Sequence, residues 1–142
     1  MKARMLSAGA VALVLLCIGA APARAQLAAA LREAMAANIA AYDRGDAAGT
    51  LATIDSHSPD YAPTKQALEE QFKDGGVKAE LVQFDYVGHD DEFGVARVKI
   101  KTTGKPASGF TDNITDAMVL FHMENGTWKL WSQDLLGVQI LQ

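Results

Sequence analysis

Residues 42–46 read Tyr-Asp-Arg-Gly-Asp, and residues 124–131 read Glu-Asn-Gly-Thr-Trp-Lys-Leu-Trp. The first stretch closes a helical pattern with a glycine, a residue that ends helices because it tolerates a left-handed backbone. The second contains Asn-Gly, which is typical of a two-residue β-hairpin turn. The chain therefore starts with helices and finishes with antiparallel strands.

Upstream of the first stretch, apolar residues recur at helical spacing and alanines, the best helix formers, lie between them. This pattern predicts an amphipathic helix from Gln26 to Asp43. Gly45 is expected to end it, and Asp46 to cap a shorter helix that reaches Ile54. The apolar face of the longer helix consists of Leu27, Leu31, Met35, Ile39 and Tyr42.

A third helix is predicted after Ser58-Pro59. Serine is a favoured N-cap, and proline is tolerated at the first helical position because its missing N–H would be unpaired there. The apolar face of this helix consists of Tyr61, Leu68 and Phe72, and the helix is expected to end at Gly75-Gly76.

After Gly76 the apolar period changes to two residues, which is typical of strands. The first predicted strand points Phe84 and Tyr86 to one face. The second has Ala96, Val98 and Ile100 on one face and Arg97, Lys99 and Lys101 on the other. Residues 89–92 form the turn between them, and residues 103–109 form a loop.

The third strand, from about Phe110 to Met123, and the fourth, ending near Leu141, flank the Asn125-Gly126 turn. Strict alternation would put Trp128, Leu130, Ser132 and Asp134 on one face. Helices followed by an antiparallel meander predict one α+β domain, in which N-terminal helices pack inside a curved four-stranded sheet.

Residues 1–25 have the layout of a cleavable export signal. Lys2 and Arg4 precede an uncharged apolar run, and Ala23-Arg24-Ala25 fits a small-x-small cleavage site. The run is shorter than the about 20 residues that span a bilayer. We expect cleavage between Ala25 and Gln26, a single domain over residues 26–142, and a periplasmic or secreted location.

Cleavage would remove Cys17, the only cysteine, together with three basic residues. The remaining chain has 10 Lys and Arg against 17 Asp and Glu. No disulfide can form, so the core must stabilise the domain. The acidic balance argues against nucleic acid or a membrane as a partner, because both are bound chiefly through clustered basic residues.

The order of these elements, with Tyr42-Asp43-Arg44-Gly45-Asp46 after the first helix and Asn125-Gly126 in the last hairpin, resembles the nuclear transport factor 2-like superfamily. That family includes ketosteroid isomerases and SnoaL-like cyclases. The resemblance implies a cystatin-like cone whose interior, lined by the first helix and the inward strand faces, is the ligand site.

The resemblance implies that this chain has the fold of the family, but the residues that the isomerases use are not found at the corresponding positions. Isomerases of this family use an aspartate base with a tyrosine and a protonated aspartic acid as hydrogen-bond donors to the oxyanion. The tyrosine position corresponds to Asn38 and the second acid to Met118. The segment expected to supply the base, residues 55–60, has the pattern of a helix start.

The ligand pocket expected from the inward faces has polar and apolar members. Asp134 and, secondarily, Asp116 are the acids that could act as a base there. The expected pocket residues are Asn38, Tyr42, Phe84, Tyr86, Asn113, Thr115, Val119, Phe121, Trp128, Leu130, Ser132 and Asp134.

We expect no metal site and no cofactor, because His57, His89 and His122 lie in three separate segments without ligand spacing.

Three functions remain open from the sequence. The first is a non-enzymatic domain that binds a small apolar or amphipathic molecule, or a protein partner. The second is an enzyme of the SnoaL or isomerase type that uses Asp134 or Asp116 with Tyr42 or Asn38. The third is a homodimeric envelope module that associates through an outer sheet face bearing Met118 and Trp131. Filling of the cone by side chains would favour the third.

Overall fold

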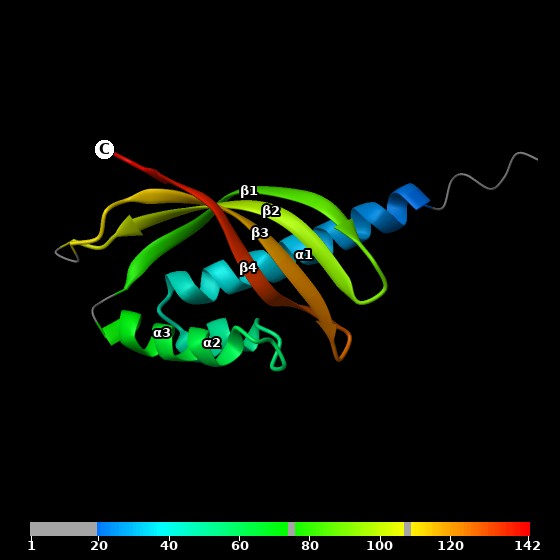
Figure 1. The fold of residues 1–142 in the computed structure, drawn as a ribbon, viewed down its shortest axis with the longest axis horizontal. Coiled ribbons are helices and arrows are strands. Elements are labelled where there is room, and N and C mark those ends of the chain that lie inside the picture. Colours follow the sequence, from blue (N-terminus) through cyan, green and yellow to red (C-terminus); the bar gives the residue numbers. More distant parts are fainter. Residues whose placement is uncertain (1–19, 74–75, 107–108) are drawn as a thin grey trace, which may run out of the picture.

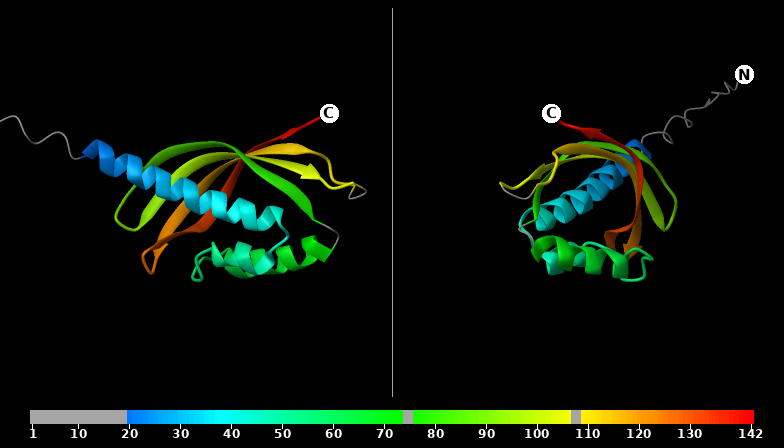
Figure 2. Two further views of the ribbon diagram at one scale, coloured as in Figure 1. Left: turned by 180° about the vertical axis from the view of Figure 1, so that it is seen from behind. Right: turned by 60° about the vertical axis from the view of Figure 1, so that its left-hand side comes forward.

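A computed structural model of the 142-residue chain describes residues 20–73, 76–106 and 109–142. Three helices, α1 (Ala20–Asp43), α2 (Ala47–Ala52) and α3 (Tyr61–Lys73), precede four strands, β1 (Val77–His89), β2 (Phe93–Gly104), β3 (Asn113–Glu124) and β4 (Thr127–Ile140). The strands form one antiparallel sheet in the order β1-β2-β3-β4. The sheet curves over α1, and α2 and α3 form a further layer beneath (Figures 1 and 2). The predicted α+β architecture is confirmed.

Helix α1 begins at Ala20, six residues before the predicted start, and residues 1–19 of the predicted signal lie outside the described residues. Residues 23–26 are exposed, and the hydrophobic contacts of α1 begin at Leu27. The Arg24 guanidinium lies 5.2 Å from the centre of the Tyr86 ring. Residues 23–25, directly before the expected cleavage point, therefore lie outside the core.

In the described part of the chain, no helix is both long and apolar enough to cross a membrane.

The α1–α2 junction follows the predicted chemistry. Gly45 has φ 70°, and the Asp46 carboxylate accepts a 2.8 Å hydrogen bond from the Gly49 N–H. Helix α2 ends at Ala52, so Ile54 does not extend it. Ile54 instead forms a parallel bridge with Leu130, and the flanking Thr53 carbonyl and Asp55 N–H bond to the Leu130 backbone. The loop after α2 thus covers part of the edge of β4.

Helix α3 starts at Tyr61, three residues after the predicted N-cap. The Ser58 hydroxyl accepts the Asp60 N–H at 3.0 Å, and the Ser58 carbonyl accepts the Tyr61 N–H at 3.1 Å. These bonds close a turn before the helix, so Pro59 lies in that turn and not at the first helical position.

Strand β2 alternates as predicted. Ala96, Val98 and Ile100 are buried against the helices, whereas Arg97 lies on the outer face. The Arg97 guanidinium binds the Asp116 carboxylate with two hydrogen bonds, of 2.8 and 2.6 Å. Both residues belong to the convex side of the sheet.

Strand β4 does not keep the predicted alternation. Phe121 pairs with Leu130 but Leu120 pairs with Ser132, so Trp131 is an extra residue in β4. A β-bulge of this kind reverses which face the following side chains occupy. Asp134 pairs with Met118 on the outer face, and the prediction that Asp134 points into the cone is wrong.

The core lies between α1 and the inner face of the sheet. Leu31 and Met35 of α1 are fully buried. A Cβ placed on Gly94 of β2 would lie 2.7 Å from a Leu31 methyl carbon, so glycine allows the helix to approach the strand. On the second half of β4, by contrast, Leu135, Leu136, Val138 and Ile140 are exposed.

Gly94→Ala should lower the free energy of unfolding by about 1–3 kcal/mol, the usual cost of overpacking a filled core. Gly137→Ala is the matched control, because it is also a strand glycine and a Cβ there meets nothing within 4 Å. Urea denaturation of both variants measures the difference. Equal stabilities would contradict the close contact between Leu31 and Gly94.

Candidate functional site

A hollow of about 250 Å³ opens between the helices and the first half of β4. We call it the helix-side hollow. Helices α1, α2 and α3 contribute to it, and so do the loop after α2 and β4. Its lining residues are Asn38, Tyr42, Thr50, Ile54, Asp60, Thr64, Ala67, Leu68, Gln71, Leu130, Trp131, Ser132 and Gln133.

A second hollow, of about 200 Å³, lies between α1 and the inner face of the sheet. We call it the sheet-side hollow. It shares Asn38, Tyr42 and Gln133 with the first, so the two hollows adjoin, and we call them together the cavity. Its other lining residues are Met35, Ile39, Ala79, Ile100, Thr102 and Thr115.

Asn38 is held in a fixed position at the centre of the cavity. Its side-chain nitrogen donates to the Thr53 hydroxyl at 2.7 Å, and that hydroxyl donates to the Thr50 carbonyl at 2.6 Å. Asn38 is only 9% exposed, so its amide is a buried polar group with a preset orientation. Such groups fix the orientation of a bound ligand.

Tyr42 lies one helical turn further along α1. Its ring packs against Phe72 of α3 with centroids 5.4 Å apart. Burial raises the pKa of the Tyr42 phenol above its ordinary value, and a hydrogen bond with the Gln71 side chain opposes this only in part. The phenol is therefore neutral at physiological pH and can donate or accept a hydrogen bond.

Side chains fill the other end of the cone. Phe121 and Met35 are fully buried, and the Phe84 ring lies 6.5 Å from that of Phe121. Trp128 also packs against this core. The cone is thus closed at one end and open at the end formed by Asn38, Tyr42 and Gln133.

The structure brings only part of the predicted pocket together. Asn38, Tyr42, Thr115, Leu130 and Ser132 line the cavity. The remaining inward residues, Val119, Phe121, Phe84, Tyr86 and Trp128, belong to the core or pack against it. Asn113 is a neighbour of the lining, since its side-chain oxygen accepts the Thr115 hydroxyl at 3.3 Å.

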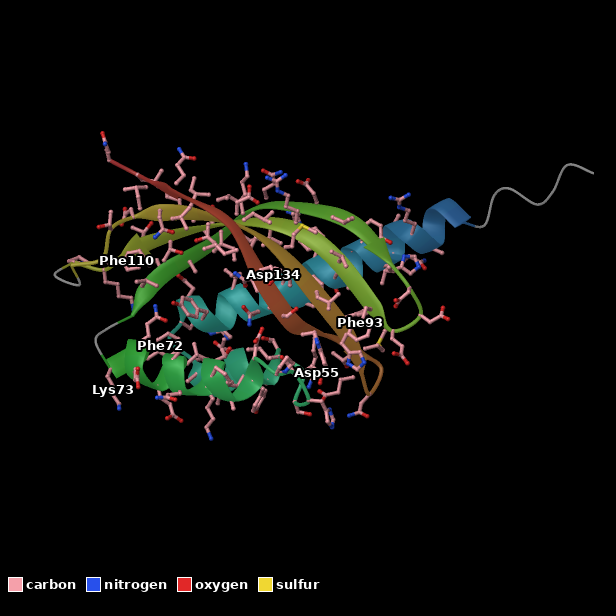
Figure 3. The ribbon with its side chains drawn as sticks, viewed as in Figure 1. Asp55, Phe72, Lys73, Phe93, Phe110 and Asp134 are labelled. Atoms are coloured by element: carbon pink, nitrogen blue, oxygen red, sulfur yellow. The ribbon has the colours of Figure 1, made fainter. Side chains whose placement is uncertain are left out.

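The two predicted acids lie outside the cavity. Asp134 is exposed on the outer face of β4 (Figure 3). Asp116 is on the same face, where the hydrogen bonds from Arg97 hold its pKa below the ordinary range. Neither carboxylate is placed to act on a ligand in the cavity.

The sequence did not lead us to expect that α3 lines the cavity. Thr64, Ala67, Leu68 and Gln71 line the helix-side hollow. Their spacing of three and four residues places them on one helix face, and this signal was available beside the predicted apolar face. Gln133 could not be found from alternation, because the bulge at Trp131 turns it inward.

A separate group of polar side chains lies where the loop after α2 meets the β3–β4 hairpin. We call Asp55, Ser56, His57, His122 and Glu124 the hairpin cluster. Asp55 is fully buried, and its Oδ2 lies 2.6 Å from Nδ1 of His122. Burial alone would raise the pKa of Asp55, but hydrogen bonds from His122 and from the His57 N–H outweigh it and lower that pKa.

Glu124 forms the other side of the hairpin cluster. Its Oε2 lies 2.5 Å from the Lys129 ammonium, and its Oε1 accepts hydrogen bonds from the Ser56 hydroxyl and from the Ser56 N–H. The Lys129 contact, followed by the Ser56 hydroxyl, lowers the pKa of Glu124 to about 2. Glu124 is thus ionised at physiological pH.

The hairpin cluster is not a nucleophile triad. Such a triad requires the hydroxyl and the carboxylate to contact different nitrogens of the histidine. Here the Ser56 hydroxyl and the Asp55 carboxylate both approach Nδ1 of His57, at 3.3 and 3.4 Å.

Aromatic rings cover the outer side of this region. Trp131 meets Phe93 edge-on at 5.7 Å and His122 at 5.0 Å, and Phe93 and His122 are 4.8 Å apart. Asp55 and Phe93 lie toward the same end of the sheet (Figure 3). Trp131, expected in an outer association face, is therefore partly engaged within its own chain.

Solved structures share this fold at low sequence identity. A protein of unknown function from Mycobacterium tuberculosis superposes with a TM-score of 0.72 and 10% identity, over 84% of this chain and 76% of that chain. A nuclear transport factor 2-like protein with a cystatin-like fold from Novosphingobium aromaticivorans gives 0.65 and 13%, over 86% and 90%.

A type 2 hexachlorocyclohexane dehydrochlorinase gives a TM-score of 0.61 with 9% identity, over 87% of this chain and 94% of that chain. At these identities the likeness concerns the fold alone. No curated protein matches the chain.

Helix α1 inside the curved antiparallel sheet, with α2 and α3 beneath it, gives this chain the cystatin-like fold of the nuclear transport factor 2-like structure above. The family model described as the C-terminal domain of anti-sigma-I factor RsgI9 matches residues 33–141. The chain belongs to the family that this model describes, the C-terminal domain of anti-sigma-I factor RsgI9.

The raised pKa of Tyr42 can be measured directly. A raised folded-state pKa means that the stabilising effect of the neutral phenol is complete below pH about 10, the ordinary tyrosine value, and is lost as pH rises through the folded pKa. Subtracting the phenolate absorbance titration of Tyr42→Phe from that of the wild type should give a midpoint above about 10. A midpoint at or below this value, with circular dichroism showing a folded chain, would contradict burial of the phenol.

Proposed function

We propose that this chain is an exported, non-enzymatic domain that binds a small amphipathic molecule in the cavity between α1, α3 and β4. The observation that carries the proposal is the lining of that cavity. Apolar walls from Ile54, Leu68 and Leu130 face polar groups of Asn38 and Tyr42. Ligand sites in proteins combine apolar walls with a few fixed polar groups in this way.

The size of the cavity restricts the ligand. A cavity of roughly 150 Å³ accommodates a benzene molecule. The helix-side hollow, at about 250 Å³, suits one ring with substituents, and the sheet-side hollow extends it by about 200 Å³. The neutral phenol of Tyr42 and the amides of Asn38, Gln71 and Gln133 suit an uncharged hydroxyl or carbonyl group on that ring.

The composition of the cavity favours binding over catalysis. Among the described residues that line it, Asp60 is the one carboxylate, and it is exposed. General acid–base catalysis needs a titratable group within hydrogen-bond reach of the reacting atom and with a pKa suited to proton transfer. Asp134 and Asp116, the acids on which an enzymatic function would depend, lie on the outer face.

A cavity-filling variant tests the binding site. Ala67 of α3 is exposed and lines the helix-side hollow, so Ala67→Trp should block the hollow without disturbing the core. In a thermal-shift screen of monocyclic phenols and ketones, hits should stabilise the wild type by about 2.7 kcal/mol at 100 times Kd. The same hits should leave the melting temperature of Ala67→Trp unchanged.

Ala62→Trp is the matched control for this screen. It introduces the same ring on the same helix at an exposed position that does not line the cavity. It should respond to the ligands as the wild type does. A hit that stabilises all three proteins equally would show that binding occurs elsewhere on the chain.

Export is the second part of the proposal. It rests on the basic, apolar and small-residue order of residues 1–25 and on the exposure of residues 23–26 at the start of α1. Intact-mass measurement of the chain recovered from its native envelope should give the mass of residues 26–142. A mass that includes Met1 would contradict cleavage.

A further inference from the structure

We propose that the hairpin cluster binds a divalent transition-metal ion such as Zn²⁺ through Asp55, His57 and Glu124. One donor atom from each residue lies within 4.8 Å of the other two. Histidine nitrogen and carboxylate oxygen are both zinc ligands in proteins. The site is separate from the cavity, and its function would be independent of the ligand proposed there.

The two distances from the histidine nitrogen match the ligand spacing of tetrahedral coordination, and the two carboxylate oxygens lie within 4.8 Å of each other. Nδ1 of His57 lies 3.4 Å from Oδ1 of Asp55 and 3.5 Å from Oε1 of Glu124. With zinc–ligand bonds of about 2.1 Å, neighbouring ligand atoms of a tetrahedron are about 3.4 Å apart. The histidine nitrogen is thus already at ligand spacing from both carboxylate oxygens.

The second oxygen of each carboxylate contacts a basic side chain other than His57. Oδ2 of Asp55 lies 2.6 Å from Nδ1 of His122, and Oε2 of Glu124 lies 2.5 Å from the Lys129 ammonium. Each carboxylate therefore directs one oxygen toward His57 while a second group fixes the other oxygen. Metal ligands are characteristically oriented by such outer hydrogen bonds.

Backbone contacts position the same two ligand oxygens. The His57 N–H donates to Oδ1 of Asp55 at 2.8 Å, and the Ser56 N–H donates to Oε1 of Glu124 at 3.1 Å. A carboxylate oxygen can accept more than one interaction, so these bonds are compatible with metal coordination. The Ser56 hydroxyl lies 3.3 Å from Nδ1 of His57 and also donates to Oε1 of Glu124, so it is next to two of the proposed ligand atoms.

The exposure of the three residues gives the ion a route into the site. Asp55 is fully buried and Glu124 is 9% exposed, whereas the His57 side chain is 79% exposed. Two carboxylates that converge on one point repel each other, and a cation between them would relieve that repulsion. The ligands lie at positions 55, 57 and 124, so sequence spacing gives no sign of the site.

Calorimetric titration of the EDTA-treated and dialysed chain with Zn²⁺ tests the proposal. The wild type should bind one ion per chain, and its melting temperature should rise with Zn²⁺ concentration. Loss of a group that only orients a metal ligand typically lowers metal affinity by about 10- to 100-fold. His57→Ala, which removes a ligand itself, should weaken Zn²⁺ binding by more than this. Because His57 is exposed, this variant should melt like the wild type in EDTA.

His89→Ala is the matched control, since His89 is also exposed and, as the last residue of β1, directly precedes the acidic residues Asp90 and Asp91. It should bind Zn²⁺ as tightly as the wild type. Co²⁺ should give the intense visible absorption of tetrahedral coordination with the wild type and with His89→Ala, and lose it with His57→Ala. The proposal is wrong if the wild type takes up no stoichiometric ion, or if His57→Ala binds as tightly as the wild type.

Discussion

Leu31 lies against the bare backbone of Gly94, and this contact sets how closely α1 approaches the inner face of the sheet. At this end Leu31, Met35 and Phe121 are fully buried. The sheet is curved over α1 (Figure 1), and further along this helix the polar side chains of Asn38 and Tyr42 line the cavity. One close helix–strand contact thus produces both a filled core and an open cavity in the same cone.

The loop after α2 gives the open end its wall. Thr53 and Asp55 bond to the backbone of Leu130, and the Ser58 hydroxyl donates to the Trp131 carbonyl. These bonds hold the loop on the edge of β4, where Ile54 lines the cavity and Asp55 enters the hairpin cluster. The cavity and the hairpin cluster therefore depend on the same short segment, although the cavity is largely apolar and the cluster is charged.

Periodicity in the sequence predicted the helices, the strands and most of the core, because apolar spacing reflects which face is buried. It failed where local pairing interrupts the period. The apolar spacing at Ile54 continues that of α2, and only its bridge to Leu130 takes it out of the helix. The extra residue at Trp131 keeps an apparently regular strand pattern while turning Gln133 inward and Asp134 outward. Asp55 and Glu124 meet only through tertiary structure.

The location of the ligand site is tested most directly by an NMR titration of the ¹⁵N-labelled chain with p-cresol, a single ring with one hydroxyl. If the cavity is the binding site, the largest shifts should occur at the side-chain amides of Asn38, Gln71 and Gln133. Ala67→Trp should abolish these shifts. Shifts concentrated instead on the exposed apolar half of β4, from Leu135 to Ile140, would contradict the assignment of the cavity as the ligand site.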